Sequence, residues 1–115
     1  MADDVRTLVQ RYLRASIERD AAALRSCLAD EIRFDWGVVM YTDPEDFVAA
    51  VAGGEVEWRE WTELAAVYDD DSAAVFYEGV NAAADVRLRA AEHLVIESEA
   101  IVASVVVFSQ VPLQT

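Results

Sequence analysis

The sequence predicts an α+β fold, with three helices in the first half and an antiparallel sheet in the second. Apolar residues at helical spacing, acids suited to cap helices and a pair of glycines come before residue 56. Beyond that point lie four stretches typical of strands, separated by the short polar breaks DDDS, NAAAD and ESEA. Helices segregated from consecutive hairpins indicate the α+β class. We expect one domain, residues 1–115.

Three helices are expected before the sheet. In the first, apolar residues recur at helical spacing from Val5 to Ile17. A short second helix places Leu24 and Leu28 on one face, and a third starts at Pro44 and ends at the two glycines. The acids suited to cap these helices are Asp3 or Asp4, Asp20 and Asp43.

Strands are expected where polar and apolar residues alternate. EIRFDW, residues 31–36, is the first, and four more follow at residues 56–68, 73–80, 86–97 and 100–109. The last strand is apolar on both faces, with Ile101, Val105 and Val107 expected on one side and Val106 and Phe108 on the other. Because helices cover only one face of such a sheet, we expect a homodimer packed through the outer sheet face. The alternative is that the tail QVPLQT folds over that face.

One acid interrupts the apolar face of an otherwise regular strand. In RLRAAEHLVIE, residues 87–97, Glu92 alternates in phase with Leu88, Leu94 and Ile96, whereas His93 points to the opposite, outer side. Burial would raise the pKa of Glu92, making it a neutral hydrogen-bond donor or a proton shuttle. The alternative is a structural acid that is hydrogen-bonded within the core. We expect His93 to be a surface or interface residue.

Composition excludes several classes of partner. The chain has 9 basic and 22 acidic residues, a formal net charge of −13, so it repels nucleic acid and anionic lipid. Its single cysteine, Cys27, can form no internal disulfide, and with one histidine no metal site is expected. No apolar stretch is long enough to cross a membrane, and the N-terminus does not resemble a signal peptide. We expect a cytoplasmic protein.

Two long segments match a known family in pattern and spacing. They are VRTLVQRYLRASIERDAAALRSCLADEIRF and AVFYEGVNAAADVRLRAAEHLVIESEAIVASVVVF, with LVQRY and AEHLVIE as their most characteristic parts. They resemble segments of bacterial ketosteroid isomerases and of the wider SnoaL-like and nuclear-transport-factor-2-like superfamily. The resemblance implies a cystatin-like or SnoaL-like fold: a cone-shaped, curved antiparallel sheet wrapped around three N-terminal helices. It also implies a pocket at the wide end and dimers formed through the sheet.

The resemblance assigns candidate catalytic residues by position. Tyr12 matches the tyrosine that supplies a hydroxyl to the isomerase oxyanion hole, and Glu92 matches its second donor, an aspartic acid kept protonated in an apolar site. The position of the isomerase's general base is Trp36, which cannot take a proton. The neighbouring Asp35 is therefore the candidate base, although strict alternation turns it to the opposite face unless a β-bulge precedes Trp36.

Aromatic residues are the candidate substrate-binding groups. Trp36, Trp58 and Tyr77 are expected to line a hydrophobic pocket. Trp58 and Trp61 differ by an odd number, so a regular strand would turn only one of them to the cavity.

Two hypotheses of function follow. The first is a small SnoaL-like isomerase or cyclase that needs no cofactor and acts on a steroid- or polyketide-like ketone. In it Tyr12 and Glu92 would stabilise an enolate while Asp35, or a water that it holds, moves the proton. The second is a non-catalytic module that binds a small hydrophobic molecule or dimerises.

Overall fold

The helices form where the sequence supplies caps and apolar stripes. A computed structural model describes residues 2–37, 39–54, 57–82 and 84–112 and places α1 at Ala2–Glu18, α2 at Ala21–Ser26 and α3 at Pro44–Ala52. Asp20 caps α2 by accepting from the Ala23 N–H at 3.1 Å, and Asp43 caps α3 by accepting from the Glu45 N–H at 2.8 Å. These two predictions are confirmed. Asp3 and Asp4, the predicted alternatives for the first cap, instead lie within the first turn of α1.

Six strands form one sheet in the order β2-β1-β6-β5-β4-β3. Their bounds are β1 Leu28–Asp35, β2 Met40–Tyr41, β3 Trp58–Tyr68, β4 Ser72–Asn81, β5 Val86–Glu97 and β6 Ala100–Val111. Strands β3 to β6 are the predicted antiparallel meander. The sheet as a whole is mixed, because β1 runs parallel to β6. A hairpin forces antiparallel pairing, but β1 and β6 are far apart in the chain and are free of that constraint.

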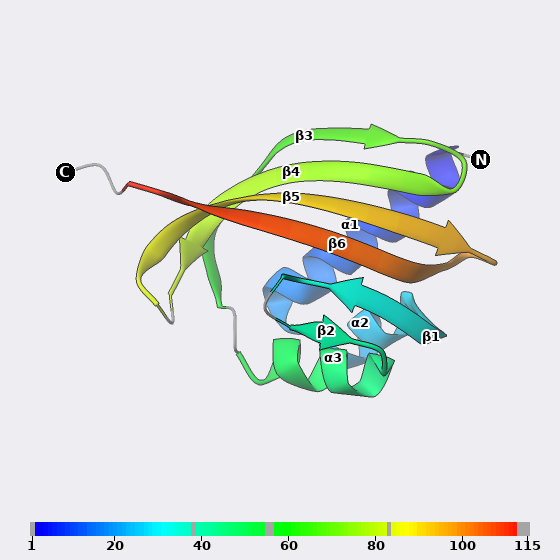
Figure 1. Cartoon of the computed structure of the whole chain (residues 1–115). Coiled ribbons are helices and arrows are strands. Elements are labelled where there is room, and N and C mark those ends of the chain that lie inside the picture. Colours follow the sequence, from blue (N-terminus) through cyan, green and yellow to red (C-terminus); the bar gives the residue numbers. More distant parts are fainter. Residues whose placement is uncertain (1, 38, 55–56, 83, 113–115) are drawn as a thin grey trace.

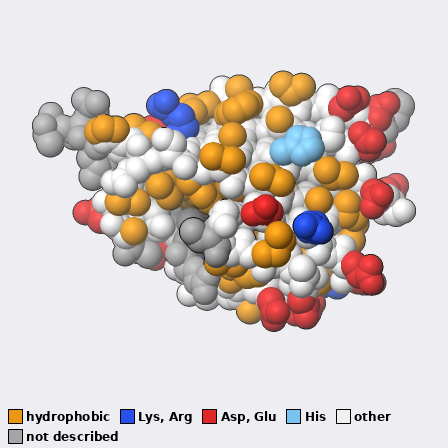
Figure 2. Space-filling model, in the orientation of Figure 1, with side chains coloured by type: hydrophobic (Ala, Val, Ile, Leu, Met, Phe, Trp, Pro, Cys, Tyr) orange, Lys and Arg blue, Asp and Glu red, His pale blue; other side chains and the backbone are white. Residues whose placement is uncertain are grey.

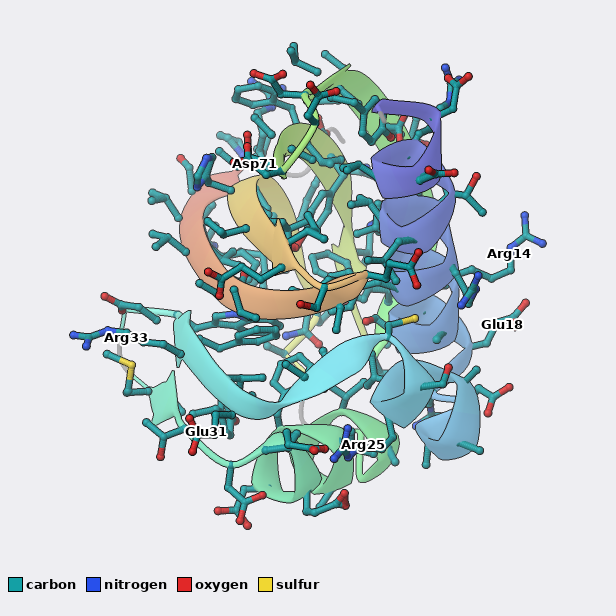
Figure 3. The ribbon with its side chains drawn as sticks, turned by 90° about the vertical axis from the view of Figure 1, so that its right-hand side faces the viewer. Arg14, Glu18, Arg25, Glu31, Arg33 and Asp71 are labelled. Carbon is teal, nitrogen blue, oxygen red and sulfur yellow. The ribbon has the colours of Figure 1, made fainter. Side chains whose placement is uncertain are left out.

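The sheet curves around α1. In Figure 1, β3 to β6 arch over α1, while α2 and α3 lie near β1 and β2. The view in Figure 3 shows the same curvature end-on, and the labelled Arg14, Glu18, Glu31 and Arg33 point away from the enclosed space. That space holds the hydrophobic core, in which Phe34 and Phe47 are fully buried. The inner face of the sheet is defined here as the face toward α1.

Register shifts, two of which bear on the predictions, decide which side chains reach the inner face. Glu60 in β3 has a positive φ of 53°, and the β3–β4 register shifts between Arg59 and Thr62. The β5–β6 register shifts as well, because Val95 pairs with Ala103 whereas Ile96 pairs with Ile101. This second shift corrects one expectation. Ile101 does not share the side of Val105 but is fully buried.

The outer face of the sheet is apolar and open to solvent. It is defined by Val67, Phe76, His93, Val105 and Val107, of which the four apolar side chains are between 44% and 66% exposed. Figure 2 shows hydrophobic side chains spread over this face, with the one histidine among them. Among the described residues, no helix is long and apolar enough to cross a membrane.

Candidate functional site

Three hydroxyl groups converge on the carboxyl group of Glu92. The Tyr12 hydroxyl donates to Oε2 at 2.7 Å, and the Ser104 hydroxyl donates to the same oxygen at 2.8 Å. The Tyr77 hydroxyl donates to Oε1 at 2.9 Å. Glu92 is only 2% exposed, and it is the one buried carboxyl group among the described residues. We call these four side chains the Glu92 cluster.

Strand pairing explains the convergence. Glu92 lies between Val75 of β4 and Val106 of β6 on the inner face. Tyr77 and Ser104 are each two residues from one of these partners, so they are diagonal neighbours of Glu92 on the same face. Tyr12 reaches the cluster from the apolar stripe of α1.

Aromatic packing fixes the ring of Tyr12. It stacks on Phe47 of α3 with 6.4 Å between ring centroids and meets Phe34 of β1 edge-on at 6.3 Å. Because the ring is held on both sides, its hydroxyl is aimed at Glu92.

Burial sets the protonation behaviour of the cluster. Desolvation raises the pKa of Glu92, against the lowering effect of the hydrogen bonds from Tyr12, Ser104 and Tyr77. Desolvation and then the charge of Glu92 raise the pKa of both Tyr12 and Tyr77 well above the usual value. The two phenols therefore stay protonated and remain donors across the physiological range.

A small cavity adjoins the cluster. Its volume is about 20 Å³, room for about one water molecule. Its polar wall is formed by Tyr12, Ser16, Tyr77 and Glu92, and its apolar wall includes Leu13, Ile17, Trp36, Trp58 and Trp61. All the predicted site residues except Asp35 therefore lie around one cavity.

The bulge in β3 brings two tryptophans to this cavity rather than one. Both Trp58 and Trp61 contact the ring of Tyr77, with centroid distances of 5.8 Å and 5.4 Å. The extra residue at Glu60 resets the alternation between them. Gly79 allows Trp58 to lie close to β4, because a Cβ at Gly79 would lie 2.8 Å from the Trp58 ring.

Trp36 contributes an unsatisfied donor. Its ring packs against Phe47 at 5.2 Å and Phe108 at 6.1 Å. Its Nε1–H is buried and has no hydrogen-bond acceptor in the described part of the chain. Such a donor is uncommon among the buried polar groups of a folded protein.

Asp35 lies outside the cavity. The register shift in β1 lies earlier, between Leu28 and Arg33, and the last residues of the strand alternate regularly. Asp35 pairs with Val105 and Met40 on the outer side. It is exposed, and its Oδ1 accepts from the Gly37 N–H at 3.0 Å. The geometry gives no support to Asp35 as the base of a site at Glu92, because strict alternation holds here.

His93 lies away from the cavity. His93 is exposed between Ala74 and Val105 on the outer face. Within the described ranges, no three histidine, cysteine or acidic side chains are arranged to hold a metal ion.

Sequence reasoning did not predict Ser104 as a member of the site, and it placed Trp61 at the cavity only if the strand were irregular. Ser104 is the one hydroxyl inside the apolar run IVASVVVF and alternates in phase with Val106. That oddity is the signal that identifies it as a partner of a buried acid. Trp61 was excluded only on the assumption of a regular strand.

Comparisons with known proteins relate the chain by structure alone. No family model matches, and no curated protein matches in sequence. A provisionally assigned ketosteroid isomerase from Kribbella flavida superposes with a TM-score of 0.85 at 17% identity, covering 99% of this chain and 84% of that one. An NTF-2 like protein of unknown function from Burkholderia xenovorans gives 0.83 at 11% identity, covering 98% and 88%.

A third similar structure is a steroid delta-isomerase from Pseudomonas aeruginosa. It has a TM-score of 0.74 at 12% identity, covering 92% of this chain and 80% of that one. Identities this low establish a common fold and carry no activity across. The helices, the curved sheet and these neighbours agree, and the chain has the cystatin-like α+β fold of the nuclear-transport-factor-2-like proteins.

Proposed function

We propose that this protein binds a small, mainly apolar molecule against the Glu92 cluster, in the cavity walled by Trp36, Trp58 and Trp61. The observation that carries the proposal is a buried carboxyl group beside a cavity lined by three tryptophans, one of which, Trp36, has a buried N–H without an acceptor among the described residues. Apolar walls with a few convergent polar groups are typical of small-molecule sites. A core that served stability alone would not need a buried acid, because burial of a carboxyl group costs free energy.

Entry of a ligand requires the cavity to widen. A volume of about 20 Å³ holds nothing larger than about one water molecule. Trp58 and Trp61 are only partly buried, and they belong to β3, an edge strand that pairs with β4 alone. The wall formed by β3 is therefore the part that moves when a ligand enters.

Binding without reaction is favoured by the lack of a second proton acceptor. Among the described residues that line the cavity, Glu92 is the only one with a carboxyl group, and none is a histidine. An isomerase that uses Tyr12 and Glu92 as donors needs a separate base, and Asp35 faces the other way.

A ligand titration tests the proposal. The probes are toluene, phenol and acetophenone, followed through the three indole N–H resonances in two-dimensional NMR. We expect the indole resonances of the cavity to shift in the native chain. They should not shift in Ile17→Trp, which fills the cavity, and they should shift in Val67→Trp, which adds the same ring to the outer face. Unchanged binding to Ile17→Trp, or no binding of any probe to the native chain, would contradict the proposal.

Enolate-stabilising isomerisation is the second candidate. It is favoured by the 2.7 Å contact between Tyr12 and Glu92 and by the steroid delta-isomerase among the structural neighbours. The assay is conversion of a β,γ-unsaturated ketone to its conjugated isomer, which increases ultraviolet absorbance. We expect no turnover above buffer. Turnover that Glu92→Gln abolishes and His93→Gln retains would place this candidate first.

We also propose that two copies associate through the outer face. Four exposed apolar side chains surround His93 there, and closed two-fold pairing is the commonest assembly of such a face. Charges near one end of the face are paired within the chain, Arg89 with Glu78 at 3.1 Å and Arg87 with Glu60 at 3.1 Å. This region therefore adds little to the repulsion between two chains of charge −13.

Sedimentation at several protein concentrations tests the association. Val107→Lys should weaken the dimer about tenfold or more, because it buries a charge in an apolar contact. The control Val39→Lys, between β1 and β2, changes an exposed valine elsewhere and should leave the dimer intact. A native chain that stays monomeric at every concentration would refute this proposal.

A further inference from the structure

The carboxyl group of Glu92 retains one unused acceptor position. An ionised carboxylate offers about four lone-pair positions, two on each oxygen. In the described residues, Oε2 receives the hydroxyls of Tyr12 and Ser104, whereas Oε1 receives only that of Tyr77. All three neighbours donate, which suits the ionised form of Glu92. One further donor can therefore bind at Oε1.

Trp36 also lines the cavity, and its buried Nε1–H has no acceptor among the described residues. Three aromatic rings pack on this indole; those of Phe47 and Phe108 carry no oxygen, and the hydroxyl of Tyr41 does not accept from it. A group that binds here must therefore accept a hydrogen bond from Trp36 while donating one to Glu92.

The two requirements distinguish between the common polar groups. A ketone or an ether oxygen accepts but cannot donate, and an ammonium group donates but cannot accept. A hydroxyl group does both. Of the other lining residues, Ser16 donates its hydroxyl to the Tyr12 carbonyl oxygen at 3.0 Å. The rest, Leu13, Ile17, Trp58 and Trp61, are apolar or aromatic, so the remainder of the molecule is mainly hydrocarbon.

We infer that the ligand of this cavity is a hydroxyl compound, a phenol or an apolar alcohol, whose O–H donates to Glu92 and accepts from Trp36. The inference rests on the proposed binding function and adds the chemistry of the ligand's polar end. It also predicts an order of affinity, because a polar site rejects a ligand that leaves its groups unpaired.

Matched probes separate this inference from binding itself. Phenol, toluene and acetophenone are titrated separately into the native protein at mildly alkaline pH, with NMR of the indole resonances as the readout. We expect phenol to bind about tenfold more tightly than toluene and more tightly than acetophenone. The Trp36 Nε1–H resonance should move downfield with phenol and not with toluene.

Two variants locate the effect. Trp36→Phe keeps an aromatic ring and removes the unpaired N–H, and should reduce the preference for phenol over toluene without abolishing it, because the hydrogen bond to Glu92 remains. Trp61→Phe lines the same cavity but loses no buried unpaired donor, and should keep the preference. The titrations of phenol, toluene and acetophenone into the native protein test the hydroxyl inference even if a variant fails to fold.

The outcomes are distinguishable. If toluene or acetophenone binds the native chain as tightly as phenol, the hydroxyl inference is overturned while the binding function stands. If no probe binds, the binding function fails and the inference fails with it. If phenol binds preferentially but Trp36→Phe keeps that preference undiminished, the assignment of Trp36 is overturned.

Discussion

Glu92 and His93 are adjacent in β5 but belong to opposite environments. Glu92 is 2% exposed and receives three hydroxyl groups, whereas His93 lies in solvent among apolar side chains. Adjacent residues of a strand point to opposite faces, so a step of one residue separates a buried polar cluster from a solvent-exposed apolar surface. Each face therefore carries the residue type that simple patterning would place on the other.

The buried acid of the inner face and the exposed apolar side chains of the outer face differ in their cost in free energy. On the inner face the polar groups are paired with one another, so burial of the acid is offset by hydrogen bonds. On the outer face the apolar groups have no cover within the described chain. Local rules that a sequence breaks tend to mark functional positions. The inner face is then suited to a small ligand and the outer face to a second protein surface.

The largest effect is expected when the acid is removed. Glu92→Leu takes away the shared acceptor of Tyr12, Tyr77 and Ser104 and leaves three buried hydroxyls unpaired. We expect the free energy of unfolding to fall by roughly 3 kcal/mol or more, measured by urea denaturation. The matched change on the outer face, His93→Leu, should alter stability by less than about 0.5 kcal/mol. Equal losses in the two variants would show that the faces do not differ as described.

A smaller loss is expected when the close approach of Trp58 to β4 is blocked. Gly79→Ala would place a Cβ 2.8 Å from the Trp58 ring and 3.2 Å from the Arg59 carbonyl oxygen. Overpacking of this kind costs about 1–3 kcal/mol, and the indole resonance of Trp58 should shift. Ala74→Val, an added volume on the outer face, should be nearly neutral. An unchanged Trp58 resonance in Gly79→Ala would contradict the packing.

Removal of one hydrogen-bond donor at a time should lower the free energy of unfolding by less than the two changes above. Tyr12→Phe and Tyr77→Phe each delete one hydrogen bond to Glu92 and should each lower the free energy of unfolding by about 1 kcal/mol. Tyr68→Phe, a partly buried tyrosine away from the cluster, is the control. Each loss should also raise the pKa of Glu92 further, because a hydrogen bond to the ionised form is removed. A downward shift in that pKa would be inconsistent with donation by the phenols.

The most gradual effect is the pH dependence of stability. Because burial raises the pKa of Glu92, the folded chain holds that proton more tightly than the unfolded chain, whose value lies near the ordinary 4.5. The contribution of this carboxyl to stability is thus fully present below pH 4.5 and is lost as pH rises through the folded pKa. The free energy of unfolding of the native chain, minus that of Glu92→Gln, should decrease over that range. A difference that grows with pH would reverse the sign and refute the assignment.

The sequence alone placed much of the site because alternation and helical spacing are local. Strand phase put Glu92 on the inner face, helical spacing put Tyr12 on the apolar stripe of α1, and Asp20 and Asp43 cap the helices as predicted. These features depend on backbone geometry within a few residues of each position. The outward direction of Asp35 followed from the same rule.

What only the tertiary structure decided depends on contacts between distant segments. The bulge at Glu60 brought Trp61 to the cavity beside Trp58. The register shift near Ile101 changed the face of β6 on which that side chain lies. Ser104 became a partner of Glu92 through strand pairing, and β1 joined β6 in parallel. The volume of the cavity and the lack of a described acceptor for the Trp36 Nε1–H depend on the positions of many side chains. Local patterning cannot fix such quantities, because they arise from how whole elements pack.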